Sequence, residues 1–157
     1  MDTHNVARQR DDTAASMTNV IKLDNYRSEG EPELFLVKPG EYLAAYIRHV
    51  PYRRMFGTAQ QKLRYDFKLL ESPGITLSRW YRVVQSRGRI TASNSSDIVR
   101  ELSVVLGQRF RRDRIPVEGL TNKIVRVRVE TVTKNRNQKN LHSINQYSVI
   151  AELLGLG

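Results

Sequence analysis

Cysteine is absent from this chain of 157 residues, which excludes a disulfide, a zinc–thiolate site, an iron–sulfur cluster and a thiol nucleophile. The chain also lacks any run of about 18 apolar residues that could span a membrane. Its first 20 residues contain no apolar segment that would serve as a signal peptide. We therefore expect a soluble, cytoplasmic protein that does not contact a membrane.

Groups of residues typical of catalysis are missing as well. The three histidines, His4, His49 and His142, are isolated, and no paired carboxylates or Walker-type glycine loop occur. Residues 87–89 read Arg-Gly-Arg, with too few glycines for a phosphate loop. A nuclease needs clustered acids to hold its metal, and acids are sparse outside the N-terminal segment. We expect a non-enzymatic protein that holds no cofactor and no metal.

Positive charge is what the chain has in excess. Lys and Arg number 26 against 16 Asp and Glu, giving a formal net charge of +10. Residues 1–30 hold four basic and five acidic residues, a net charge of −1, so the remaining 127 residues carry +11. A surplus confined to the body of the protein favours a polyanionic partner, most often a nucleic acid.

The N-terminal segment differs from the rest of the chain in polarity and periodicity. Residues 1–33 are polar and lack sustained periodicity, which is typical of a flexible arm. Its apolar residues Val20, Ile21, Leu23 and Tyr26 fit either a docking motif or an arm that lies along the domain. Residues 34–157 are then one domain.

Five segments of this domain read as strands, at residues 41–50, 62–70, 75–84, 123–133 and 144–153. The second has the clearest alternation, with Leu63, Tyr65, Phe67 and Leu69 on one side and mostly basic residues on the other. A Ser-Pro-Gly turn at residues 72–74 joins it to the third strand in a tight antiparallel pair.

One segment reads as a helix instead, at residues 97–106. Its apolar residues form a single stripe with a 3.6-residue period: Ile98, Val99, Leu102, Val105 and Leu106. Ser95 or Ser96 is placed to cap its start, and Gly107 to close its end. The sequence therefore predicts one amphipathic helix between the third and fourth strands.

Five strands with a helix between the third and fourth follow the order of the OB-fold, a partly open five-stranded barrel. The chain resembles OB-fold single-stranded DNA-binding proteins, particularly the divergent ones of bacteriophages and mobile genetic elements. Four segments carry this resemblance, which covers residues 38–153: PGEY at 39–42, KLRYDFKLLE at 62–71, SSDIVRELSVVLG at 95–107 and GLTNKIVRVRVE at 119–130.

The resemblance implies a mainly β, OB-fold-like barrel that binds single-stranded DNA during replication or recombination, largely independently of base sequence. One feature departs from the family: many members end in an acidic tail that recruits other replication factors, whereas this chain ends AELLGLG. The N-terminal arm is then the remaining candidate for contacts with replication or recombination proteins.

In this fold, the face of strands two and three and the loops joining strands one to two and four to five grip oligonucleotides. The first loop here, residues 51–61, combines Tyr52, Arg53, Arg54 and Phe56, which supply cations for phosphates and flat rings for bases. The two aromatic residues could instead fold back as a lid on the barrel. The second loop, residues 134–142, is basic too, although a solvated hairpin tip reads the same way.

In one register of the third strand, the residues that point inward are Ile75, Leu77, Tyr81 and Val83. Trp80 and Arg82 then point outward, beside Arg64 and Lys68. Trp80 flanked by Arg79 and Arg82 then makes a stacking platform; the opposite register buries Trp80 and exposes Tyr81. On the fourth strand, Arg126 and Arg128 either extend the path or bracket Glu130. The candidate nucleic-acid-binding residues are Arg48, Tyr52, Arg53, Arg54, Phe56, Lys62, Arg64, Lys68, Arg79, Trp80, Arg82, Arg126, Arg128, Lys134, Arg136 and Lys139.

Two other functions stay open at this point. An RNA-binding OB module would use the same loops, because the 2′-hydroxyl is read by details of geometry that a sequence does not show. A protein-interaction or assembly barrel would bind no nucleic acid, and salt-insensitive self-association would favour it. Whether the chain forms a homo-oligomer also stays open.

Overall fold

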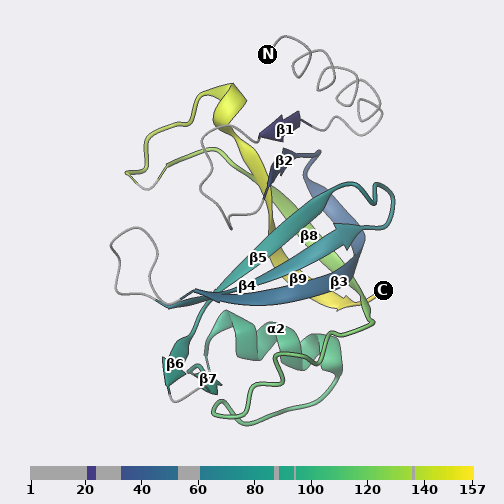
Figure 1. Ribbon diagram of the computed structural model, residues 1–157, viewed down its shortest axis with the longest axis vertical. Helices are drawn as coiled ribbons and strands as arrows, with labels where there is room; N and C mark the ends of the chain where they lie inside the picture. The colour runs from purple at the N-terminus through teal and green to yellow at the C-terminus, as the bar shows by residue number, and fades with distance from the viewer. Residues whose placement is uncertain (1–20, 24–32, 53–60, 87–88, 94, 136) are drawn as a thin grey trace.

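The computed structural model describes residues 21–23, 33–52, 61–86, 89–93, 95–135 and 137–157 (Figure 1). Within them the protein is mainly β with one α-helix. The elements are β1 (Ile21–Leu23), β2 (Leu34–Leu36), β3 (Gly40–Tyr52), β4 (Lys62–Leu69), β5 (Thr76–Arg82), β6 (Val84–Ser86), β7 (Arg89–Thr91), α2 (Asp97–Leu106), β8 (Ile124–Val132), the 3₁₀ helix η2 (Ser143–Asn145) and β9 (Tyr147–Leu156).

Five strands form one antiparallel sheet in the order β5-β4-β3-β8-β9 (Figure 1). The long strand β3 serves both neighbours: Ala44 pairs with Leu69 of β4 and with Val125 of β8. A register shift between Tyr46 and Arg48 marks a bulge, which bends β3. The sheet curls until β5 and β9 contact each other, yet no ladder of the described residues joins them. The five predicted strands are thus confirmed, but they do not form a closed barrel.

Alternating apolar residues build the core inside this curled sheet. On β4, Leu63, Tyr65 and Phe67 are fully buried, as the alternation predicts. On β5, Tyr81 is only 2% exposed, so the predicted register, with Tyr81 inward and Trp80 on the opposite side, is confirmed. Burial raises the pKa of the Tyr65 phenol, with nearby Tyr46 adding to the effect. The tyrosine hydroxyls are therefore neutral polar groups of the core.

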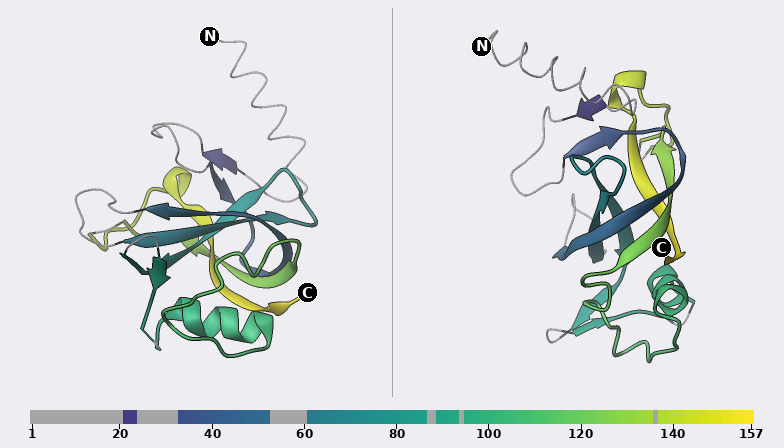
Figure 2. Two further views of the ribbon diagram at one scale, coloured as in Figure 1. Left: turned by 60° about the horizontal axis from the view of Figure 1, so that its bottom comes forward. Right: turned by 90° about the vertical axis from the view of Figure 1, so that its right-hand side faces the viewer.

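Helix α2 covers one end of the sheet, and the β1–β2 hairpin lies at the other end (Figure 2). The predicted helix and its stripe are confirmed, because Ile98, Leu102 and Val105 are buried against the core. Gly107 ends the helix with φ of 66°, a left-handed conformation that glycine adopts without a Cβ clash. Ser96 occupies the N-cap position, but its side chain makes no capping hydrogen bond, so that part of the prediction is wrong.

A buried carboxylate connects the two edge strands of the sheet, β5 and β9. Glu101 of α2 is 1% exposed and accepts hydrogen bonds from the Tyr81 hydroxyl of β5 (2.9 Å) and the backbone N–H of Leu153 of β9 (2.7 Å). Arg79 of β5 adds Nε and Nη2 contacts of 3.1 and 2.5 Å. Burial alone lowers the pKa of Arg79, but the hydrogen bond to Glu101 and the nearby acidic groups raise it overall. Glu101 thus connects β5 and β9 where no ladder does.

Part of the predicted arm belongs to the fold. Strand β1 pairs antiparallel with β2, and Phe35 of β2 and the following Val37 are buried in the core. The Ser148 hydroxyl of β9 accepts a hydrogen bond from the Val37 N–H at 2.8 Å and so fixes the hairpin's second strand. The rest of the predicted arm, residues 1–20 and 24–32, lies outside the described residues.

Candidate nucleic-acid interface

The side of β3, β4 and β5 that faces away from the core carries seven of the sixteen predicted site residues. The pairing register places Arg64 opposite Trp80 and Lys62 opposite Arg82 on this side. It carries five cations and one carboxylate. We call it the outer face and define it by Arg48, Val50, Tyr52, Lys62, Arg64, Asp66, Lys68, Thr76, Ser78, Trp80 and Arg82.

Asp66 and Arg64 lie buried at the centre of the outer face, with Asp66 0% and Arg64 4% exposed. Arg64 Nη2 donates to Asp66 Oδ2 at 2.9 Å, and Nε lies 2.8 Å from Oδ1, although only the first contact has hydrogen-bond geometry. Ser78 donates to the same carboxylate at 2.7 Å. Arg64 thus lies on the predicted side of β4, but it is buried there and forms an ion pair with Asp66.

Two aromatic rings cover Arg64. Its guanidinium carbon lies 5.4 Å from the ring centre of Tyr52 and 5.8 Å from that of Trp80. The two rings are 5.2 Å apart, and the Tyr52 hydroxyl accepts a hydrogen bond from Arg64 Nη1 at 2.5 Å. Cation–π and ring contacts hold each side chain in one orientation. Trp80 is therefore half-buried and held in place before any ligand arrives.

Three cations of the outer face keep their charge for an external partner. Lys68 and Arg82 are exposed and Lys62 is half-buried, and none of the three forms an ion pair with another described residue. Arg48 is 54% exposed, but its Nε lies 2.8 Å from Asp66 Oδ2. The cations without an ion pair among the described residues thus lie toward the two ends of β4: Lys62 pairs with Arg82 beside Trp80, and Lys68 pairs with Thr76 at the other end.

Three other predicted arginines lie elsewhere. Arg79 is on the opposite side of β5, held by Glu101, so it does not flank Trp80 as predicted. Arg128 of β8 pairs with Glu130 and with Glu152, the latter at 3.0 Å, which matches the bracketing alternative. Arg126 is 52% exposed and lies 3.6 Å from a Glu41 oxygen. In the sheet order, β3 separates both β8 arginines from β4 and β5.

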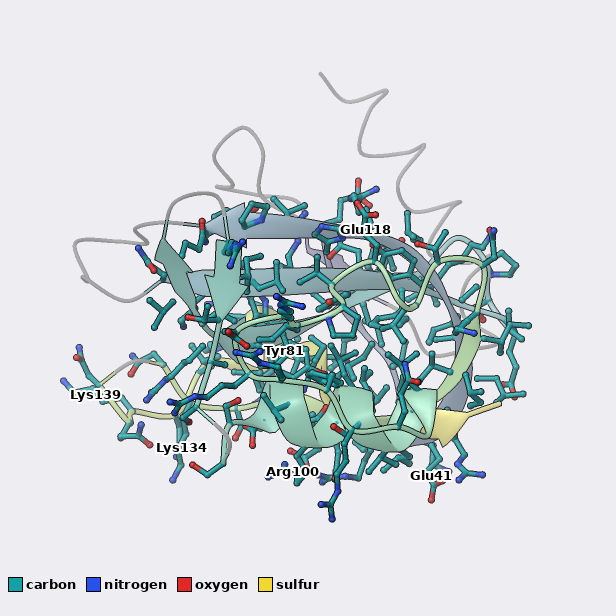
Figure 3. The ribbon with its side chains drawn as sticks, turned by 90° about the horizontal axis from the view of Figure 1, so that it is seen from below. Glu41, Tyr81, Arg100, Glu118, Lys134 and Lys139 are labelled. Carbon is teal, nitrogen blue, oxygen red and sulfur yellow. The ribbon has the colours of Figure 1, made fainter. Side chains whose placement is uncertain are left out.

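The two predicted binding loops are described in part. Arg53, Arg54 and Phe56 of the first loop and Arg136 of the second lie outside the described residues. Lys134 and Lys139 are exposed and extend outward on one side of the molecule (Figure 3).

The fold of the second loop explains why its lysines extend outward. Asn135 Oδ1 accepts hydrogen bonds from the backbone N–H groups of Asn137 (2.9 Å) and Lys139 (3.1 Å). A bridge between Lys134 and Asn140 closes the turn behind them. The loop is thus a defined hairpin tip that presents two lysines to solvent.

Next to Trp80 the surface is hollowed by a groove of about 680 Å³. It lies between the end of β5, strand β6 and the segment that leads into α2. We call it the Trp80 groove. Its lining consists of Lys62, Trp80, Tyr81, Arg82, Val83, Val84, Ala92, Ser93, Ser95, Ser96 and Asp97. The sequence did not predict it, because residues 84–96 show no pattern that places them against Trp80.

A run of arginines after α2 was also left out of the predicted site. Arg109, Arg111, Arg112 and Arg114 are exposed, and of the four only Arg111 has an ion pair among the described residues, with Asp113. The Ala92 N–H donates to the Arg112 carbonyl at 3.2 Å, which places this loop beside the wall of the Trp80 groove. The pattern in the sequence that could have indicated this loop is four arginines within six residues.

The chain matches no protein-family model, no curated protein and no solved structure. No helix in the described ranges is both long and apolar enough to cross a membrane. Those ranges also contain no group of three or more Asp, Glu or His arranged to hold a metal ion. A function for the protein must therefore be argued from its own side chains.

Proposed function

We propose that this protein binds single-stranded DNA on the outer face without catalysing a reaction and with little dependence on base sequence. The observation that carries this proposal is Trp80, held against Tyr52 and Arg64 and flanked by Lys62 and Arg82, two cations with no ion pair among the described residues. A single strand offers unstacked bases to an aromatic ring and phosphates to cations. A ring held in place beside two such cations suits both the bases and the phosphates of a single strand.

The topology supports an OB-fold as the domain type. The order β5-β4-β3-β8-β9, with contact between β5 and β9 and with α2 at one end, is compatible with a partly open five-stranded barrel. In that fold the second and third strands carry the ligand face, and these strands are β4 and β5 here. This correspondence supports the outer face and the second loop, with Lys134 and Lys139, as the proposed surface for the strand.

The shape of the site favours single strands over duplex DNA. A duplex hides the flat surfaces of its bases by stacking, and it is read by elements that enter a groove. The outer face is made of strands, and its aromatic surface needs an unstacked base. Replication or recombination of a phage or mobile element, in the cytoplasm, is the setting that the resemblance suggests for this activity.

Arg82→Ala should weaken binding of a single strand of about 16 nucleotides and flatten its salt dependence. Each phosphate contact on a single strand contributes about 0.7 to the slope of log K against log salt concentration, so the slope should fall by about that amount. Fluorescence anisotropy of a labelled oligonucleotide at several salt concentrations measures both quantities.

Arg126→Ala is the matched control, because it removes one exposed arginine from β8, off the outer face. It should change the affinity and the slope less than Arg82→Ala does. Equal effects of the two substitutions would contradict a site on the outer face and would indicate a general attraction to the whole basic surface.

A further inference from the structure

We infer that the Trp80 groove takes one nucleobase out of the bound strand. This inference rests on the proposed function and goes beyond it, since stacking on the surface of Trp80 would need no cavity. The groove's volume of about 680 Å³ falls within the range of about 300–1,000 Å³ typical of small-molecule sites. A base with part of its sugar fits such a space.

The floor of the groove suits a flat aromatic ring. Tyr81, Val83 and Ala92 are 2%, 7% and 9% exposed, so this buried, largely apolar part of the lining is the floor of the groove, and the half-buried indole of Trp80 lines it as well. A base that enters exchanges water on its flat surfaces for contact with this floor and the indole. Phosphate, which is strongly hydrated, would gain nothing from apolar walls.

The polar groups of the groove can bond to the edge of a base. Ser93, Ser95 and Ser96 contribute hydroxyls, and Ser96 Oγ is buried with no hydrogen-bond partner among the described residues. A hydroxyl both donates and accepts, so it can bond to the edge of any of the four bases. The groove therefore fits a protein with little sequence preference.

The charges around the groove allow the negatively charged backbone of the strand to run past it on either side. The carboxylate of Asp97 lies 3.0 Å from Arg100 and 3.5 Å from Arg79, which balances its charge. Lys62 of β4 and Arg82 of β5 contribute two cations that form no ion pair within the described ranges. The arginine loop after α2 reaches the wall at Ala92, so the backbone of a strand that leaves the groove meets further positive charge.

Ser93→Phe tests the inference by filling the groove from an exposed position, where the new ring does not displace core residues. It should weaken binding of a single strand of about 16 nucleotides by about tenfold, with the salt slope unchanged, because it removes a base contact and no phosphate contact. Ser95→Phe, at a second exposed position of the lining, should do the same. Thr121→Phe, an exposed substitution outside the groove, should bind like the parent.

An abasic oligonucleotide separates a base from a phosphate as the occupant. If the groove holds a base, Ser93→Phe and the parent bind the abasic strand equally, because neither can place a base there. If the groove holds backbone, Ser93→Phe still weakens binding of the abasic strand, and the inference is overturned.

Two failures are distinguishable in this experiment. Parent-like affinity of folded Ser93→Phe and Ser95→Phe for the normal strand overturns the base pocket and leaves the proposed function intact. A parent protein that does not bind the normal strand at all overturns the proposed function and the pocket together. Thermal melting of each variant shows that it is folded.

Discussion

Glu101→Ala is expected to lower the free energy of unfolding by about 3 to 5 kcal/mol, the range measured when one partner of a buried ion pair is removed. The substitution leaves Arg79 without its main acceptor and leaves the Tyr81 hydroxyl and the Leu153 N–H without the oxygen that they share. It also breaks the connection between β5 and β9, where no ladder compensates. Urea unfolding followed by circular dichroism measures the loss.

Glu118→Ala is the control for this prediction, because Glu118 is an exposed glutamate outside that network. It should change the free energy of unfolding by no more than about 0.5 kcal/mol. Glu101→Gln, which keeps hydrogen bonding but removes the charge, should fall between the two. If Glu101→Ala lowered the free energy of unfolding by less than about 1 kcal/mol, Glu101 of α2 would not be what holds the edge strands β5 and β9 together.

Trp80→Ala should weaken binding of single-stranded DNA by about 1 to 3 kcal/mol, or roughly 5- to 150-fold in Kd. The salt slope should stay that of the parent, because stacking of a base on a ring releases no counterions. Trp80→Phe, which keeps a flat ring over Arg64, should recover much of the affinity. Anisotropy titrations of the three proteins at several salt concentrations measure this.

The same substitution also removes packing from Tyr52 and Arg64, so its stability must be measured beside its affinity. Affinity should fall in a protein that is still folded at the temperature of the titration. A folded Trp80→Ala protein that binds as tightly as the parent would remove Trp80 from the site and leave an electrostatic mechanism.

The strands and the helix could be predicted because their residues obey strong local rules. Alternation in β4 and the 3.6-residue stripe of α2 depend on near neighbours in the chain, and burial of Tyr65 and Leu102 followed from them. In β5 the alternation left two registers open, and the structure has the one with Tyr81 inward. The bulge in β3 left no comparable pattern, since it depends on one strand serving two partners. The short strands β1, β2, β6 and β7 are too brief to show a period.

The site was harder to predict because the same charge can be open or neutralised. Arg64 and Lys68 read alike in the alternation of β4, yet Asp66 neutralises Arg64 while Lys68 stays open. Arg79 and Arg82 also read alike, but Glu101, 22 residues further along the chain, binds Arg79. Such pairs depend on contacts between residues far apart in the chain. A sequence therefore shows that positive charge is in excess, but it does not show which basic side chains are exposed and which are paired.

The most direct test of single-strand binding is a titration of the parent protein with a single strand of about 16 nucleotides and with the matching duplex, each at low and physiological salt. We expect the single strand to bind more tightly at both salt concentrations, with an affinity that falls steeply as salt increases. A matched RNA strand in the same titration decides between the two nucleic acids, and DNA should bind at least as tightly. Equal or tighter binding of the duplex at physiological salt would contradict a stacking site built around Trp80.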